Sequence, residues 1–302
     1  MGYGLEVLIL LVACQAPEPA EPGPKDTGEV SEETRPPAEI LLTEPVWTAV
    51  ELEQVLQEQL APGLAEPVSL RNWLLGTVER FTLEHEGESA ECALELVQVH
   101  EEDTLASFYN GTCESLDGLV LDGGWILSES WVLSEDTEIW QMNLLTGLEV
   151  GQADGRVARS GGQVDMKLRR VGSALEYSYA FGGDYELGLD RGWMSETTGG
   201  GLYVEGTRRP LGLVATLDGG LRRGDMVVFF DELQHDPAVC EGFTGAVEVR
   251  DPSTAWLRWE LDCGTCGPLL FGDEVLGEVC AGEALFDALE QAVSSIGGVQ
   301  PW

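Results

Sequence analysis

Apolar and polar residues alternate along most of the chain after Val78 with a period of two. Examples are Leu175, Tyr177, Tyr179 and Phe181, which are separated by Glu176, Ser178 and Ala180, and likewise Val164, Met166 and Leu168. Alternation of this kind is typical of antiparallel strands with one buried and one solvated face. The run Met226–Phe230 is continuously apolar and predicts a central strand.

Glycine-rich segments recur between these alternating stretches. They are Asp122–Gly124, Asp154–Gly155, Gly161–Gly162, Gly182–Asp184, Gly199–Gly201 and Asp218–Gly220. Because glycine accepts positive φ and Asp-Gly is a hairpin signal, we expect turns there. Leu-Asp-Gly-Gly occurs at Leu121 and again at Leu217, but four residues do not establish a repeat.

Both ends of the folded region have helical spacing of apolar residues. Thr48–Leu60 predicts a helix that Pro62 and Gly63 end, and Leu70–Leu75 predicts a second short one. Gly282–Ser294 predicts a helix at the other end. The fold class that follows is mainly β: an antiparallel sheet assembly, sandwich or open barrel, with a flanking helix at each end. We expect one domain over residues 46–302, with a possible sub-boundary near 192–201.

The start of the chain has a different character. Val7–Ala13 is apolar but shorter than the about 20 residues that span a bilayer, and it has the length of a signal-peptide core. Leu11-Val12-Ala13-Cys14 resembles the lipobox of bacterial lipoproteins. The resemblance implies that residues 1–13 are a signal peptide, that Cys14 carries diacylglyceryl on its thiol, and that its new amine is acylated, for example with palmitate.

Two further features bear on this resemblance. Residues 1–6 contain a Glu and no Lys or Arg, so the alternative is an apolar N-terminal strand with a free cysteine. By the same resemblance, Gln15 after the cysteine favours the outer membrane over the inner one. The expected location is therefore the cell envelope, lipid-anchored at the outer membrane and facing either the periplasm or the cell surface.

Residues 14–45 have the composition of a tether. Prolines alternate with acidic residues, and large apolar residues are almost absent before Ile40. Such a segment buries too little surface to offset its ordering entropy, and proline extends it by about 3 Å per residue. We expect an acidic, proline-rich tether between the anchor and the folded domain.

Charge excludes one class of partner. The chain has 16 Lys and Arg against 54 Asp and Glu, a net charge of −38. Such a protein repels phosphate backbones, so we expect no nucleic-acid partner. Calcium is an alternative to a plain solvated surface, at His100–Asp103, Ser134–Asp136 or Gly183–Glu186, but none has the register of a calcium loop.

Six cysteines follow Cys14, an even number that in an exported chain predicts disulfides. Cys92 and Cys113 lie apart from the others and are expected to pair. Strands over Thr244–Arg250 and Ala255–Leu261 would form a hairpin, which brings Cys240 near Cys263 or Cys266. One of those two is then the partner of Cys240, and Cys280 takes the other.

The same cysteines allow two other interpretations. Cys240, Cys263, Cys266 and Cys280 together could bind zinc, and Cys263-Gly-Thr-Cys266 could be a redox pair. An oxidising compartment favours disulfides over both. We therefore expect no cofactor, with zinc and calcium as the alternatives.

No catalytic motif is present. His85, His100 and His235 lie in no metalloprotease pattern, and no nucleophile elbow or nucleotide-binding loop occurs. His235 with Asp236 near Cys240 could be a nucleophile pair, although a solvated loop histidine is the simpler interpretation. Six tryptophans lie in or beside predicted strands, either as a ligand platform or as core: Trp125, Trp131, Trp140, Trp193, Trp256 and Trp259.

The leading functional hypothesis is a non-enzymatic envelope lipoprotein whose β-rich domain binds an envelope protein, a glycan or a small apolar ligand. The first alternative is a secreted-type hydrolase that uses carboxylates or a divalent metal. The second is a structural subunit of an envelope assembly.

Overall fold

The computed structural model describes residues 43–85, 97–101, 103–114, 120–151, 157–186, 188–189, 192–193, 198–210, 212–224 and 226–297. The described chain is mainly β, with antiparallel strands and a helix at each end, so the predicted fold class is confirmed. The predicted signal region 1–13, Cys14 and nearly all of the predicted tether lie outside these residues.

Two helices and fifteen strands make up the fold. They are α1 (Ala49–His85), β1 (Val97–Glu101), β2 (Thr104–Glu114), β3 (Val120–Leu133), β4 (Thr137–Gly151), β5 (Val157–Val171), β6 (Ala174–Glu186), β7 (Gly188–Leu189), β8 (Gly192–Trp193), β9 (Thr198–Arg209), β10 (Gly212–Arg223), β11 (Met226–His235), β12 (Phe243–Arg250), β13 (Trp256–Gly264), β14 (Gly267–Phe271), β15 (Glu274–Val279) and α2 (Gly282–Gly297).

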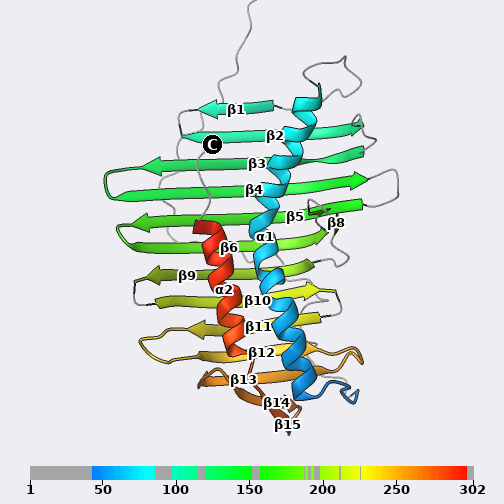
Figure 1. Ribbon diagram of the computed structural model, residues 1–302, viewed down its shortest axis with the longest axis vertical. Coiled ribbons are helices and arrows are strands. Elements are labelled where there is room, and N and C mark those ends of the chain that lie inside the picture. Colours follow the sequence, from blue (N-terminus) through cyan, green and yellow to red (C-terminus); the bar gives the residue numbers. More distant parts are fainter. Residues whose placement is uncertain are drawn as a thin grey trace, which may run out of the picture.

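Thirteen of the strands form one open sheet in chain order, β1 to β6 and then β9 to β15, while β7 and β8 pair separately. Every pairing is antiparallel, so the sheet is a continuous meander. Strand β6 pairs directly with β9, and the sheet therefore runs on past residues 192–201. Figure 1 shows both helices on one face of this sheet, with α1 crossing it diagonally beside α2.

Helix α1 is longer than the sequence predicts. Its start follows the capping-box rule, because Thr48 and Glu51 hydrogen-bond each other through side chain and backbone. The predicted stop at Pro62 and Gly63 is wrong, and so is a separate helix at Leu70–Leu75, since one helix runs on to His85.

Packing explains why α1 continues. Leu52, Leu56, Leu60, Leu64, Leu70 and Leu74 are all buried in the same core cluster. Gly63 also has a packing role, because a Cβ there would lie 2.8 Å from Leu221 Cδ2 of β10. The glycine lets the helix approach the sheet closely, and burial of the leucine stripe outweighs the local breaker signal.

The glycine-rich segments were predicted as turns, and for those the structure describes this is wrong. They lie inside β3, β5, β6, β9 and β10, while Asp154–Gly155 falls outside the described residues. Gly162, Gly183 and Gly200 face one another across the sheet with φ of 137°, 134° and 129°. We call this line of mid-strand glycines, from Gly123 in β3 to Gly219 in β10, the glycine band.

Close backbone approach explains the glycine band. A Cβ on Gly162 would lie 2.0 Å from the Gly182 carbonyl oxygen, and one on Gly183 would lie 2.0 Å from that of Gly161. No side chain fits at these positions, so glycine here allows neighbouring strands to approach closely rather than ending them.

A buried carboxylate fixes the other end of the sheet. The expected turn between β12 and β13 is present, and Asp251 in it accepts hydrogen bonds from the backbone of Ser253 and Ala255. The same side chain accepts the Val46 N–H at 2.5 Å. Asp251 therefore ties the segment before α1 to this hairpin.

Candidate functional site

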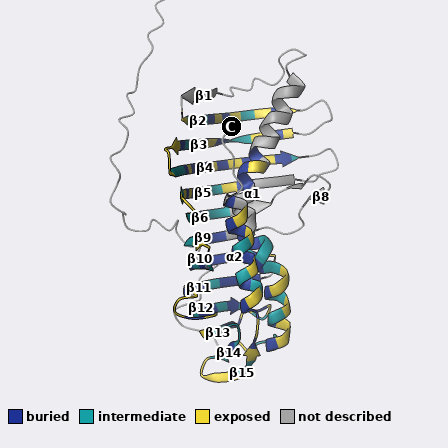
Figure 2. Cartoon of the chain, turned by 60° about the vertical axis from the view of Figure 1, so that its left-hand side comes forward, coloured by how far each residue is buried: buried dark blue, intermediate teal, exposed yellow. Residues whose placement is uncertain are grey.

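The two faces of the sheet differ in what covers them. On β4, the alternate residues Trp140, Met142, Leu144, Leu148 and Val150 are buried under the helices. Their neighbours Gln141, Asn143, Leu145 and Glu149 are exposed on the opposite side, and no described helix packs there. We call the helix side the covered face and the other side the open face; Figure 2 shows this alternation of burial.

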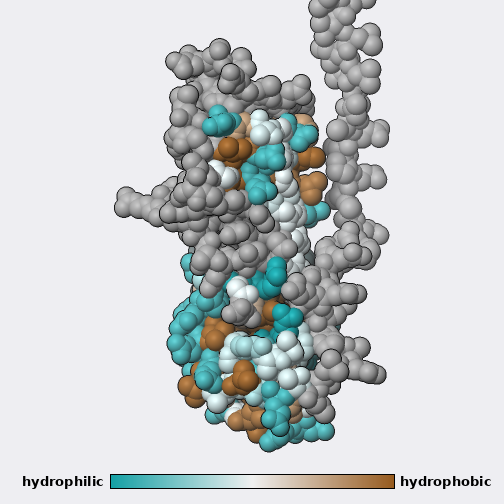
Figure 3. Space-filling model, turned by 90° about the vertical axis from the view of Figure 1, so that its right-hand side faces the viewer, coloured by the Kyte–Doolittle hydropathy of each residue, from teal (hydrophilic) through white to brown (hydrophobic). Residues whose placement is uncertain are grey.

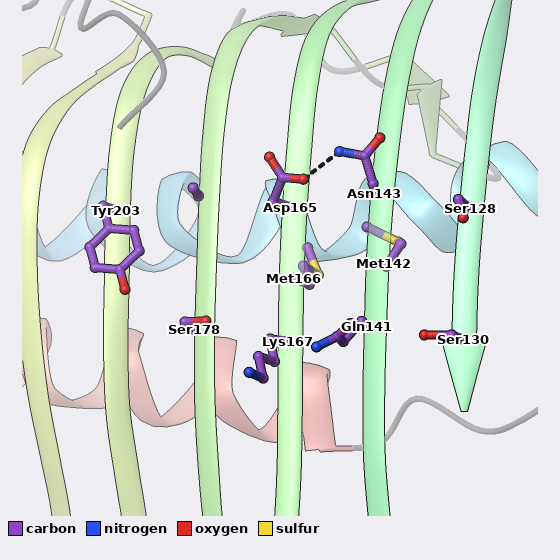
Figure 4. Close-up of a pocket in the computed structure, with 11 residues that line it drawn as sticks. Ser128, Ser130, Gln141, Met142, Asn143, Asp165, Met166, Lys167, Ser178 and Tyr203 are labelled. Atoms are coloured by element: carbon purple, nitrogen blue, oxygen red, sulfur yellow. Dashed lines mark hydrogen bonds between the residues drawn. The ribbon is translucent and has the colours of Figure 1, made fainter. Parts of the chain in front are cut away.

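Strand register gathers polar side chains on the open face into rows. One row runs Ser130, Gln141, Lys167, Ser178, Glu205 and Thr216, from β3 to β10. The next row runs Ser128, Asn143, Asp165, Ala180 and Tyr203. Figure 4 shows the part of both rows from Ser128 and Ser130 to Ser178 and Tyr203 on adjacent strands, with the helices behind the sheet.

These rows line two adjoining hollows of about 370 and 930 Å³. Gln141, Lys167, Ser178 and Tyr203 line both, so the two hollows form one continuous depression. We call it the open-face groove. The larger hollow extends over β9 and β10 to Thr207 and Thr216.

Polar side chains that donate and accept hydrogen bonds lie along the groove, together with charged and apolar ones. Asp165 accepts hydrogen bonds from the side-chain amides of Asn143 and Gln163, the latter at 2.7 Å. Tyr203 donates its hydroxyl to Glu205 at 2.6 Å. Burial, and then this contact with Glu205, raises the pKa of Tyr203, so its hydroxyl stays protonated and remains a donor.

The two cations of the groove differ in whether they have an ion-pair partner. Arg169 pairs with Glu176 at 3.0 Å across β5 and β6. The side-chain ammonium of Lys167 makes no hydrogen bond or ion pair with any residue in the described part of the chain. The groove therefore contains an ammonium group without a protein counter-ion.

An exposed apolar row borders the groove. Phe108, Ile126 and Leu145 are paired across β2, β3 and β4, and each is between 42% and 47% exposed. On the side of the molecule in Figure 3, apolar residues lie singly among polar ones. The open face thus combines a polar depression with a narrow apolar margin.

The cysteines are only partly as predicted. Cys266 and Cys280 form a disulfide with an S–S distance of 2.04 Å, which confirms that Cys280 pairs with one member of the Cys-x-x-Cys segment. Cys113 is disulfide-bonded to a residue outside the described part of the chain. Its pairing with Cys92, which also lies outside the described residues, stays a prediction.

Cys240 and Cys263 carry free thiols, although the sequence predicts both in disulfides. The hairpin does bring them together, as expected, and the neighbouring Cys240 thiol raises the pKa of the Cys263 thiol. Proximity alone leaves them as thiols, because bond formation also requires an oxidant to remove two electrons.

His235 is not a solvated loop residue. It is 5% exposed at the end of β11, and its Nδ1 lies 2.7 Å from the Gly242 carbonyl oxygen. The rings of Phe243 and Phe286 pack against it. The alternative interpretation, in which His235 and Asp236 near Cys240 form a nucleophile pair, has no support in the contacts of His235. The side chains of His85 and His100 are outside the described ones.

The tryptophans belong to the core rather than to a ligand platform. Trp125, Trp131, Trp140 and Trp259 are buried on the covered face, and Trp256 is also buried. Trp125 stacks on Tyr109, and Trp131 packs against Trp140. The side chain of Trp193 is not among those described.

The described residues contain neither a cluster of metal-ligating side chains nor a membrane-spanning helix. Among the described residues, no three His, Cys, Asp or Glu side chains are grouped to hold an ion. No described helix has both the length and the apolar character needed to cross a membrane. Calcium and zinc therefore have no candidate site in the described part of the molecule.

The groove residues were not predicted as a site. Alternation along β4 places Gln141 and Asn143 on the solvated face, but it does not reveal which strands lie beside them. One signal was available: Lys167 and Lys25 are the lysines of the chain, so a lysine within the folded region is conspicuous.

Comparison with known proteins adds no assignment. The chain matches no family model, no curated protein and no solved structure. Its function must therefore be argued from the geometry of the open face.

Proposed function

We propose that this protein is a lipid-anchored binding protein of the bacterial cell envelope, and that its open-face groove binds a glycan. The observation that carries the proposal is the row of neutral hydrogen-bonding side chains across the groove, Ser130, Gln141 and Ser178, with Asn143 beside them. Anchoring rests separately on the lipobox resemblance of residues 11–14 and on the tether composition.

The chemistry of the groove matches a polyhydroxylated ligand. Each sugar hydroxyl both donates and accepts a hydrogen bond, and so do serine hydroxyls and side-chain amides. These groups repeat from strand to strand about 4.8 Å apart, which offers an extended chain a regular series of contacts. The hollows are open rather than enclosed, as a linear chain lying on a surface requires.

A small apolar ligand fits this surface less well. Ligand pockets for such molecules are concave and predominantly hydrophobic. Here the exposed apolar side chains Phe108, Ile126 and Leu145 lie beside the groove and are part of neither hollow, and Ile139 and Val214 line the larger one among mostly polar and charged residues. They can contact the less polar faces of sugar rings that extend past the groove.

Titration calorimetry with a panel of oligosaccharides tests the binding. We expect at least one to bind, and Gln141→Ala to weaken that binding about tenfold by removing a double-function hydrogen-bonding group. The matched control is Gln234→Ala, which changes an exposed glutamine on β11 that lines neither hollow. Absence of binding across the panel, or equal losses in both variants, would contradict the proposal.

Intact mass of protein extracted from its native membranes tests the anchor. The expected mass is that of residues 14–302 plus acyl chains, and Cys14→Ser should remain in the soluble fraction. A wild-type chain found unacylated would contradict lipid anchoring and leave the groove hypothesis untouched, because the two rest on different residues.

A further inference from the structure

Lys167 is unusual in this acidic chain. It is the one lysine within the described residues, and it lines both hollows of the open-face groove. Figure 4 shows it between Gln141 and Ser178 in the middle of the depression. Its side chain is exposed, so a ligand can reach the ammonium without rearrangement.

Lys167 differs from the other cation of the groove, because Arg169 is paired with Glu176. Asp165 accepts hydrogen bonds from two side-chain amides, and Glu205 accepts one from the Tyr203 hydroxyl. The Lys167 ammonium is therefore the cation of the groove that has no ion-pair partner among the described residues. Acidic residues farther from it than a Debye length of about 8 Å are screened at physiological ionic strength.

We propose that the glycan held in the open-face groove is an acidic one, whose carboxylate, sulfate or phosphate group contacts the Lys167 ammonium. The inference rests on the proposed glycan-binding function and names its ligand class. Ser130, Gln141 and Ser178 lie in the same row and donate hydrogen bonds to the hydroxyls beside that anion. A charge-assisted contact of this kind is stronger than a neutral one.

The test compares an oligogalacturonate, as an acidic probe, with its fully methyl-esterified and therefore neutral form. Calorimetry on the full chain should show the acidic probe binding about tenfold more tightly, with a preference that weakens as salt is added. Lys167→Met should abolish the preference and Lys167→Arg should keep most of it. Arg250→Met is the charge-matched control, because it removes a cation of the open face on β12, outside the groove.

The possible results distinguish the preference for an acidic glycan from glycan binding itself. If the neutral probe binds as tightly as the acidic one, or if Lys167→Met keeps the preference, the acidic-ligand inference is overturned while glycan binding stands. If neither this pair nor any other saccharide binds, the proposed function itself fails.

The two free thiols support a second, independent inference. Phe243 pairs with Gly264, and Cys263 is the extra residue of the bulge beside that pair, with φ of 61°. A Cβ on Gly242 would lie 2.2 Å from the Gly264 carbonyl oxygen, so the backbones on either side are in close contact. Cys240 is buried at this junction, and Cys263 is exposed to reagents.

We infer that Cys240 and Cys263 close into a disulfide when a disulfide-bearing oxidant such as oxidised glutathione is present. The two thiols lose two protons and two electrons to form one S–S bond, and the oxidant's disulfide is reduced to two thiols. The new bond would tie the loop after β11 to the end of β13, close to the Cys266–Cys280 bond.

Peptide mapping of the full chain without reductant, before and after a glutathione redox buffer, tests the inference. We expect a linked pair of peptides containing Cys240 and Cys263, a mass lower by two hydrogens, and a melting temperature higher by about 5 °C or more. Cys240→Ala and Cys263→Ala should each abolish the shift. Recovery of both cysteines in alkylated form from the oxidised, then unfolded protein would overturn it.

Discussion

The two faces of the sheet are built from the same strands and serve different ends. On the covered face, adjacent strands contribute tryptophan, tyrosine and leucine side chains that pack under α1 and α2. On the open face, the intervening residues are serine, glutamine, asparagine and charged side chains that no described element covers. The comparison shows that alternate residues of the same strands can serve different purposes: those on one face stabilise the fold, and those on the other form a surface for recognition.

Charged groups make the contrast sharpest. Arg71 of α1 and Glu129 of β3 form a two-pronged ion pair, with side chains 8% and 0% exposed. Arg71 also lies 5.9 Å above the Trp140 ring. Across the sheet, Arg169 and Glu176 form a similar pair with side chains 46% and 47% exposed.

The largest expected effect comes from breaking the buried pair. Arg71→Ala leaves the carboxylate of Glu129 buried without a partner, which should lower the free energy of unfolding by about 3–5 kcal/mol. Arg169→Ala on the open face should lower it by about 1 kcal/mol or less. Urea denaturation measures both, and Arg71→Met with Glu129→Leu should recover most of the loss. Equal losses for the two single variants would contradict the comparison.

A pair of adjacent leucines tests the same contrast with neutral side chains. Leu144 is 0% exposed on the covered face, and Leu145 is 47% exposed on the open face. Leu144→Ala should destabilise the fold by about 2–5 kcal/mol through lost burial and a cavity, and Leu145→Ala by about 0.5 kcal/mol or less. Thermal unfolding followed by circular dichroism measures the difference, and similar melting temperatures would show that the open face is covered.

The glycine band gives the next smaller effect. Gly183→Ala places a methyl group against the Gly161 carbonyl oxygen at a positive φ, which should cost about 1–3 kcal/mol. Gly147→Ala is the matched control, because nothing lies within 4 Å of its Cβ position. Chemical denaturation should find the control within about 0.5 kcal/mol of wild type. A tolerated Gly183→Ala would mean that the neighbouring backbones do not approach each other so closely.

The smallest expected effect concerns thiol reactivity at the end of the sheet. The neighbouring Cys240 side chain, more than burial, raises the pKa of Cys263 from 9.0 to about 11. The pKa of Cys263 is higher in the folded state than in the unfolded state. Its contribution to the free energy of unfolding is therefore complete below pH 9.0 and is lost as pH rises through about 11.

Alkylation of the reduced protein measures that pKa. The rate at Cys263 should keep rising up to about pH 11, and Cys240→Ala should raise it roughly tenfold near pH 8, because more thiolate is then present. A rate that levels off near pH 9 in wild type would show that the thiols are apart.

Much of the fold could be predicted from local pattern. Alternation in residues 164–168 and 175–181, the apolar run 226–230 and the stripe in Gly282–Ser294 each gave the correct element. The failures share one cause. Pro62 and the mid-strand glycines are breaker residues whose effect depends on tertiary packing, which local sequence does not contain.

The candidate site could not be predicted from the sequence, for a related reason. Gln141, Lys167 and Ser178 lie on three different strands, and only the register places them side by side. A shift of one residue in any strand would move its member to the covered face. The cysteine pattern was more informative, because a hairpin fixed which thiols could meet.

Lysine footprinting tests most directly the claim that the open face is the binding face. Lys167 can be acetylated on the folded protein and quantified by mass spectrometry, and Lys25 in the predicted tether serves as an internal control in the same chain. With a bound oligosaccharide, we predict slower acetylation of Lys167 and an unchanged rate at Lys25. Binding that leaves both rates unchanged would contradict the account, because the ligand would then lie elsewhere on the molecule.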